Sequence, residues 1–287
     1  MSEDTMTIEK FIKNLGDWEP NDDGLENLDI INMYNNSEKY GKSVKEKYSK
    51  IINICINNWE DEAYKKQERL RLYLKRMKEL NPSRLFVGEA PGIDGCYRTG
   101  IPFTSEAIIS GVQTSIAFSW YFKDSQIYCE GKQREKTSTI VWGCLDHLGC
   151  LDQICKLLSK MPFMKEVKSL PQGVKLPLLW NIFPFQPLKN AEKENRKENG
   201  ELKDKECEEG IKFLFNLLRC FDINEIYPVG EHAEKTLRKL LKKEFPEIKL
   251  RESLCHPAAP RGGATKFRKK FNEIYQIEID ESEDSEE

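Results

Sequence analysis

The stretch "LFVGEAPGIDGCYRTGIPF", from Leu85 to Phe103, is the part of the sequence that says most about the fold. It begins as a short apolar run of the kind found in strands that are buried on both faces. Glu89 stands where this run ends, and four glycines and two prolines fall within the sixteen residues from Gly88 to Phe103. This order predicts a buried strand that delivers an acid into a glycine-rich loop, where ligand sites of parallel sheets are found.

Glycine lets the backbone of such a loop approach a ligand closely, and its exposed N–H groups can bind anions. The loop is not a Walker loop, because no G-K-[ST] follows it. It is not the dinucleotide fingerprint, because "GEAPGIDG" has the wrong spacing and contains a proline. A phosphate site of another kind, in a nucleotide-binding enzyme, remains an alternative at this point.

Outside this stretch, strand patterns alternate with helix patterns. Helical spacing of apolar residues covers 43–80, and Asn81-Pro82-Ser83 ends it. A helix with a break at Gly111 is expected over 105–122, and 137–158 is ambiguous between strand and helix. Further strands are expected at 84–89, 176–185, 225–231 and near 250, and further helices at 207–221, 232–245 and 263–275. The alternation predicts a three-layer α/β/α sandwich with a central, mostly parallel four-stranded sheet and an N-terminal helical extension.

The charge distribution divides the chain into three parts. Residues 1–30 and residues 278–287 each carry a net charge of −7, so the overall −3 leaves +11 for residues 31–277. We expect an acidic N-terminal extension with a long helix over 1–80, irregular over 1–38, then a folded domain over 81–277 and an acidic tail over 278–287. A basic body between acidic ends suits a polyanionic partner, and a solvated basic surface is the alternative.

The composition of the chain indicates its cellular compartment. No apolar run approaches the roughly 18 residues of a membrane span, and the first residues lack the apolar core of a secretory signal. The spacing of the nine cysteines is not that of a small scaffold held by disulfides. We therefore expect a cytoplasmic protein with reduced thiols and no membrane contact.

Three separated segments give a resemblance to a known family. "GEAPG" with "TGIPFTSE", then "WNIFPFQP", then "CHPAAPRGGATKFRKKF" follow one another in the chain. Together they resemble the uracil-DNA glycosylase superfamily over about residues 82–275, closest to its bacterial branch whose first motif reads GEAPG. The resemblance implies that residues 81–277 form a catalytic domain that flips a base out of DNA and hydrolyses its glycosidic bond.

The resemblance implies a role for each matched residue. Glu89 matches the catalytic carboxylate, which orients water and faces the positive charge that develops on the sugar. Phe103 matches the ring that stacks on the flipped base, and Asn181 matches the amide that reads the base edge. His256 matches the histidine that stabilises the departing base anion. The structural alternatives are a chance surface acid, plain core packing, a satisfied buried amide and a loop-capping histidine.

Other residues fill out the expected site. Ala90 and Gly92 would line the base pocket, and Asp94 and Glu106 are rival acids. His147 and His232 are assigned to the helix surface or to packing. The loop after His256 would wedge into the duplex, and its neighbours would contact phosphates; the expected DNA contacts are Pro260, Arg261, Gly262, Lys266 and Arg268.

The chain also departs from the family pattern. It has no C-x-x-C, so we expect neither a metal nor the iron–sulfur cluster of some relatives. Cys96 and Tyr97 are bulky residues for the first loop and keep open a substrate other than uracil, for instance a modified cytosine in phage DNA, with a role in defence instead of repair. No matched lysine is present, so we expect a monomeric, monofunctional glycosylase without a lyase step. The alternative of another class is a non-catalytic nucleic-acid-binding protein.

Overall fold

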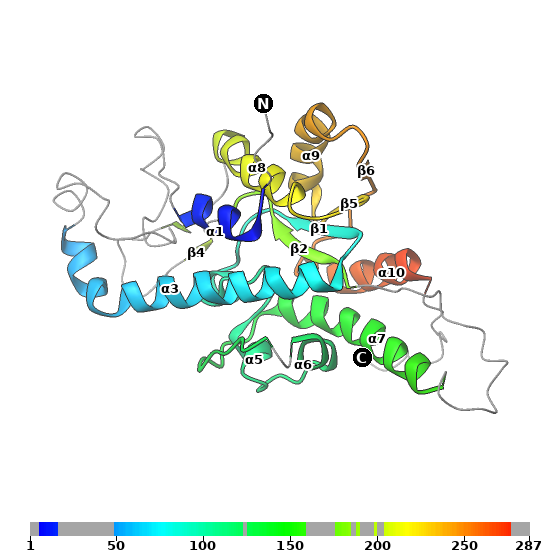
Figure 1. The fold of residues 1–287 in the computed structure, drawn as a ribbon, viewed down its shortest axis with the longest axis horizontal. Coiled ribbons are helices and arrows are strands. Elements are labelled where there is room, and N and C mark those ends of the chain that lie inside the picture. Colours follow the sequence, from blue (N-terminus) through cyan, green and yellow to red (C-terminus); the bar gives the residue numbers. More distant parts are fainter. Residues whose placement is uncertain are drawn as a thin grey trace.

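A computed structural model describes residues 6–16, 49–122, 125–158, 176–184, 188–189, 198–199 and 204–276. Its centre is a sheet of four parallel strands in the order β2-β1-β5-β6 (Figure 1). These strands are β1 (Arg84–Gly88), β2 (Leu178–Asn181), β5 (Glu225–Pro228) and β6 (Lys249–Leu250). Two further strands, β3 (Leu188–Lys189) and β4 (Glu198–Asn199), form a small antiparallel ladder. The parallel sheet is the one that the sequence predicts.

Helices cover both faces of this sheet. In Figure 1, α8 (Asp204–Leu218) and α9 (Glu231–Glu244) lie above the strands, and α7 (Lys136–Leu158) and α10 (Gly263–Tyr275) lie below them. The predicted three-layer α/β/α fold is therefore confirmed.

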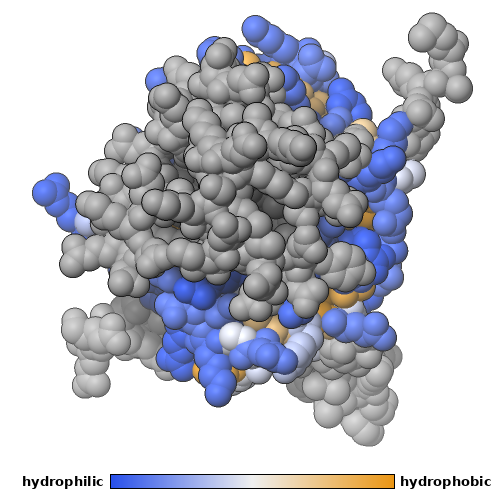
Figure 2. Space-filling view, turned by 90° about the vertical axis from the view of Figure 1, so that its left-hand side faces the viewer, coloured by the Kyte–Doolittle hydropathy of each residue, from blue (hydrophilic) through white to orange (hydrophobic). Residues whose placement is uncertain are grey.

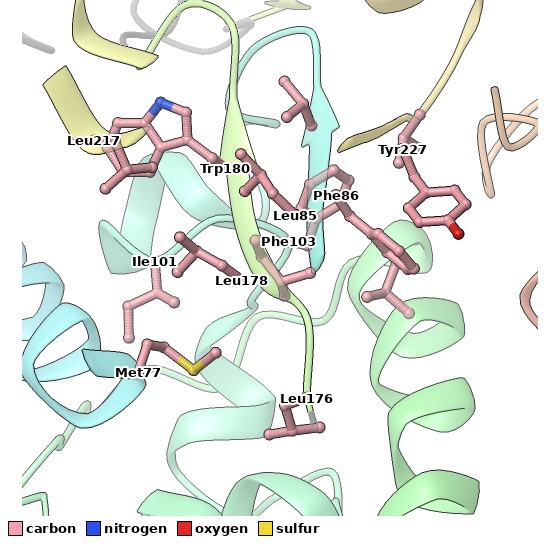
Figure 3. Packing of buried hydrophobic residues seen from close by; sticks show 14 of the residues in the cluster. Met77, Leu85, Phe86, Ile101, Phe103, Leu176, Leu178, Trp180, Leu217 and Tyr227 are labelled. Carbon is pink, nitrogen blue, oxygen red and sulfur yellow. The ribbon is translucent and has the colours of Figure 1, made fainter. Parts of the chain in front are cut away.

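Alternation along the strands explains why both faces are apolar. Phe86 of β1 packs edge-on against Phe271 of α10, with ring centroids 5.9 Å apart. Trp180 of β2 points to the opposite face, toward Leu217 of α8 (Figure 3). Successive side chains of a strand point to opposite faces, so each strand packs against the helices on both sides of the sheet.

The N-terminal helices join the same core. In α1 (Ile8–Gly16), Phe11 is fully buried and its ring lies 5.4 Å from that of Trp180. In α3 (Ser49–Leu80), the hydroxyl of Tyr73 accepts a hydrogen bond from the backbone N–H of Leu179, at 3.0 Å. Because β2 is an edge strand, this bond occupies part of an edge that would otherwise stay open to another chain.

Two expectations about helices change with the structure. The prediction that residues 1–38 are irregular is wrong over Ile8–Gly16, because Phe11 and Ile12 are buried on one helical face. The ambiguous segment 137–158 is helical throughout as α7. The break at Gly111 is confirmed: α5 (Glu106–Ile109) and α6 (Ile116–Phe122) flank it, and Gly111 has φ +75°. The domain boundaries stay a prediction.

The described part of one face matches the charged composition. On the face shown in Figure 2, the coloured side chains are mostly hydrophilic, with few apolar patches among them. None of the helices within the described ranges has the length and apolarity that a bilayer span requires.

Candidate active site

The expected base-binding residues meet at the end of β1. A Cβ atom at Gly88 would lie 2.6 Å from Cζ of Phe103 and 2.7 Å from Oδ1 of Asn181. Both side chains are largely buried, with 7% and 4% of their surfaces exposed. Gly88 therefore allows an aromatic ring and an amide, far apart in sequence, to converge over one backbone position.

Phe103 is held in an unusual backbone conformation. Its φ is +55°, the left-handed region that a bulky residue seldom adopts. The neighbouring Thr104 fixes it, because its carbonyl accepts from the Thr99 hydroxyl at 2.8 Å and its own hydroxyl accepts from Trp142 Nε1 at 3.1 Å. Strain that the surroundings maintain in this way is typical of functional sites.

Asn181 is a buried amide with a cysteine beside it. Its Nδ2 faces Sγ of Cys96 across a long contact of 4.0 Å. Burial raises the pKa of the Cys96 thiol well above its usual range, so the thiol stays protonated and neutral. The loop residue that is unusual in sequence thus forms part of the wall around the amide.

Glu89 pairs with a histidine that sequence reasoning left aside. Its Oε1 lies 2.9 Å from Nδ1 of His232, in the first turn of α9, and its backbone carbonyl accepts from Phe183 N at 3.0 Å. The carboxylate is 41% exposed, so solvent can reach it. A carboxylate at a helix N-terminus is also favoured by the helix dipole. His232 therefore lies beside Glu89, a contact that the prediction of a surface or packing role did not include.

His256 stands near this pair. Its Nδ1 accepts the N–H of Ala258 at 3.2 Å, which leaves Nε2 as the donor of a neutral ring. Desolvation lowers the pKa of His256, and the charge of Glu89 opposes this shift. The geometry thus provides a neutral imidazole on the same sheet edge as a carboxylate.

The loop after His256 turns sharply into α10. Arg261 and Gly262 both have positive φ, at +58° and +84°. The five expected DNA contacts are all exposed, and they lie in this turn or in the first two turns of the helix: Pro260, Arg261, Gly262, Lys266 and Arg268. Exposed side chains that surround a helix N-terminus suit phosphate contacts.

The rival acids Glu106 and Asp94 have different surroundings. The carboxylate of Glu106 accepts the N–H of Gln133 at 3.1 Å, so it braces a neighbouring loop. Asp94 is exposed. Ala90 is partly buried and packs on the core, directly after Glu89. Of the three acids, Glu89 is the one with a described histidine contact, and the choice among them stays a prediction.

Glu135, which the sequence analysis did not single out, packs its carboxyl group against the glycine-rich loop. Cβ atoms at Gly92 or Gly95 would collide with its carboxyl group, which also accepts the N–H of Ser138 at the start of α7. Burial raises the pKa of Glu135 to about 7, and the nearby charge of Asp94 adds to the rise. The lack of side chains at Gly92 and Gly95 therefore leaves room for the carboxyl group of Glu135.

Replacing Glu135 by glutamine should change how stability depends on pH. The folded-state pKa of about 7 lies above 4.5, so the folded chain binds more protons between these values and loses stability as pH rises through them. The loss is at most about 3 kcal/mol. Urea unfolding at pH 5 and pH 8 should show a smaller decline for Glu135→Gln than for the wild type. Equal declines would contradict the assignment.

The cysteines with described side chains give no sign of a cluster site. Six of them are free: Cys96, Cys129, Cys144, Cys207, Cys220 and Cys255. Within the described residues, no group of three or more His, Cys, Asp or Glu side chains could hold a metal ion. The absence of a metal and of an iron–sulfur cluster stays a prediction.

Comparisons with known proteins add little. No protein-family model and no curated protein matches the sequence. Among solved structures, wild-type SMUG2 of Pedobacter heparinus is similar, with 15% sequence identity and a TM-score of 0.43 over 94% of this chain and 98% of that one. A similarity of this strength assigns neither a family nor a function to the chain.

Proposed function

We propose that this chain is a DNA glycosylase that flips a damaged or modified base out of DNA and hydrolyses its N-glycosidic bond, with uracil as the default substrate. The observation that carries the proposal is the arrangement at the carboxyl end of β1. Phe103 and Asn181 meet over Gly88, and the charge of the next residue, Glu89, acts on His256. A carboxylate, an aromatic wall, a buried amide and a neutral imidazole are the groups that this reaction requires.

Each of the four side chains has one role in the proposed reaction. The flipped base stacks on Phe103, and Asn181 forms hydrogen bonds with its edge. The bond between the base and C1′ breaks, and its electron pair leaves with the base as an anion that Nε2–H of His256 stabilises. Glu89 faces the positive sugar and orients a water molecule, whose oxygen bonds to C1′ while its proton passes to solvent through the carboxylate. The products are a free base and an abasic site.

The rest of the proposal concerns the partner and the setting. DNA would bind along the turn Pro260–Gly262 and the exposed Lys266 and Arg268. We propose a monomer that acts in the cytoplasm without a metal and without a lyase step. The Cys96 thiol beside Asn181 favours, as a second candidate substrate, a modified base such as a cytosine derivative of phage DNA, because it alters the wall that reads the base edge.

A panel of oligonucleotides tests this function. Single-stranded and duplex DNA should carry uracil, hypoxanthine, xanthine or modified cytosines, and alkali then cleaves any abasic site. We expect release of at least one of these bases without added metal, and no strand cleavage before alkali. If every base is retained while DNA still binds, the chain is a non-catalytic nucleic-acid-binding protein. Tight, Mg-dependent nucleotide binding would instead support the phosphate-site alternative.

A further inference from the structure

The segment from Tyr128 to Lys136 stands out because it has no regular structure until α7 begins at Lys136 and is yet held by several hydrogen bonds. Its first end is fixed by the buried Arg69, which donates to the carbonyl of Tyr128 at 3.4 Å and to that of Thr99 at 2.8 Å. In its middle, the N–H of Gln133 donates to Glu106 and its carbonyl accepts from Ala107 N, at 3.1 and 3.0 Å.

The second end of this segment is fixed against the candidate site. Glu135 places its carboxyl group against Gly92 and Gly95, in the loop that follows Glu89. Arg69 also donates to the carbonyl of Arg98 at 3.2 Å, in the same loop. The segment therefore borders the loop that leads from Glu89 to Phe103, and contacts at both of its ends fix it there.

Its outward side chains are of two kinds. Tyr128 is 67% exposed, more than any other large hydrophobic residue in the described parts of the chain. Lys132, Arg134 and Lys136 are exposed as well, and none of the three has an acidic partner among the described residues. Glu130 is the one exposed acid of the segment. A ring that can stack on a base and cations that can contact phosphates are the two kinds of side chain that line binding sites for single-stranded nucleic acids.

We propose that Tyr128, Lys132, Arg134 and Lys136 form a binding surface for unpaired nucleotides beside the candidate active site. The cations would contact phosphates, and Tyr128 would stack on a base. Only an unpaired base exposes its face to a side chain, so the surface selects single-stranded DNA over duplex. This inference rests on the proposed function in one respect, namely that the ligand is DNA.

The test measures binding to unmodified DNA, so base release plays no part in it. A fluorescent strand of 20 thymidines and a duplex of the same length are titrated with protein at several salt concentrations. Tyr128→Ala should weaken binding of the single strand roughly 5-fold or more and leave duplex binding within about 2-fold, and Tyr128→Phe should bind like the wild type. The triple variant Lys132→Gln, Arg134→Gln, Lys136→Gln should reduce the salt slope for the single strand by about 2.

A matched control separates a local surface from overall charge. Lys242→Gln, Lys243→Gln, Lys249→Gln removes three exposed charges at the far end of α9 and the start of β6; the first two lie roughly 15 Å along the helix from His232. We expect this control to bind nearly as the wild type does. Equal weakening by both triple variants, wild-type binding by Tyr128→Ala, or equal competition by polyglutamate would each overturn the proposal. If binding behaves as expected but no base is ever released, the surface stands and the glycosylase proposal falls.

Discussion

Glu89→Gln should reduce single-turnover base release roughly 100- to 10,000-fold, because the amide can neither accept a proton from water nor oppose the positive sugar. The substitution preserves size, and glutamine can still form a hydrogen bond with His232, which lies 2.9 Å from the carboxylate. DNA affinity should therefore stay within about 2-fold, because the exposed cations near His256 and in α10 remain. Alkali cleavage measures the first quantity and fluorescence anisotropy the second.

Two variants of the rival acids serve as matched controls for Glu89→Gln. Glu106→Gln removes a carboxylate that serves the backbone of Gln133, and Asp94→Asn removes an exposed one. Each should change base release less than about 10-fold, far less than the loss at the true catalytic acid. Base release by Glu89→Gln within a few-fold of the wild-type rate would remove Glu89 from the mechanism. A large loss in Glu106→Gln alone would move the acid to the rival position.

The sheet could be predicted from sequence because its strands have a simple pattern. The apolar runs around Phe86 and Trp180 are short, lie between turn residues, and are buried on both faces. Their carboxyl ends must meet at one edge of a parallel sheet, so the sequence order already places Glu89 near Asn181. The structure adds that Gly88 is the position over which Phe103 and Asn181 converge.

The missed residues carried weaker signals. His232 follows the third strand at the same sheet edge as Glu89, and this position could have identified it, but a lone histidine at the start of a helix is common. Glu135 lies in a polar, charged stretch and directly precedes α7, with Ser138 three residues later. In the structure its carboxyl group accepts the N–H of Ser138, but glutamate is not among the residue types that predict an N-cap. Its insertion between Gly92 and Gly95 depends on tertiary packing, which no local pattern encodes.

Gly88→Ala should reduce base release roughly 100-fold and destabilise the fold by about 1–3 kcal/mol, the usual cost of overpacking. The new methyl group would need the space of Phe103 Cζ and Asn181 Oδ1, at 2.6 and 2.7 Å. Phe103 is already held at φ +55°, and Thr104 beside it is bonded to Thr99 and Trp142, so the ring has little freedom to retreat. A displacement of about 1 Å in a positioning group is enough to cost two orders of magnitude in rate. Urea unfolding and single-turnover release measure the two effects.

Gly143→Ala is the matched control, because a Cβ at this position in α7 meets nothing within 4 Å. Alanine in a helix interior should stabilise the fold by about 1 kcal/mol and leave base release unchanged. The collision itself can be tested with Phe103→Leu, which removes Cζ. If that atom is what the new methyl group of Gly88→Ala meets, the stability losses of the two substitutions should sum to more than the loss of the double variant. Strictly additive losses, or normal release by Gly88→Ala, would mean that ring and amide do not converge over this glycine.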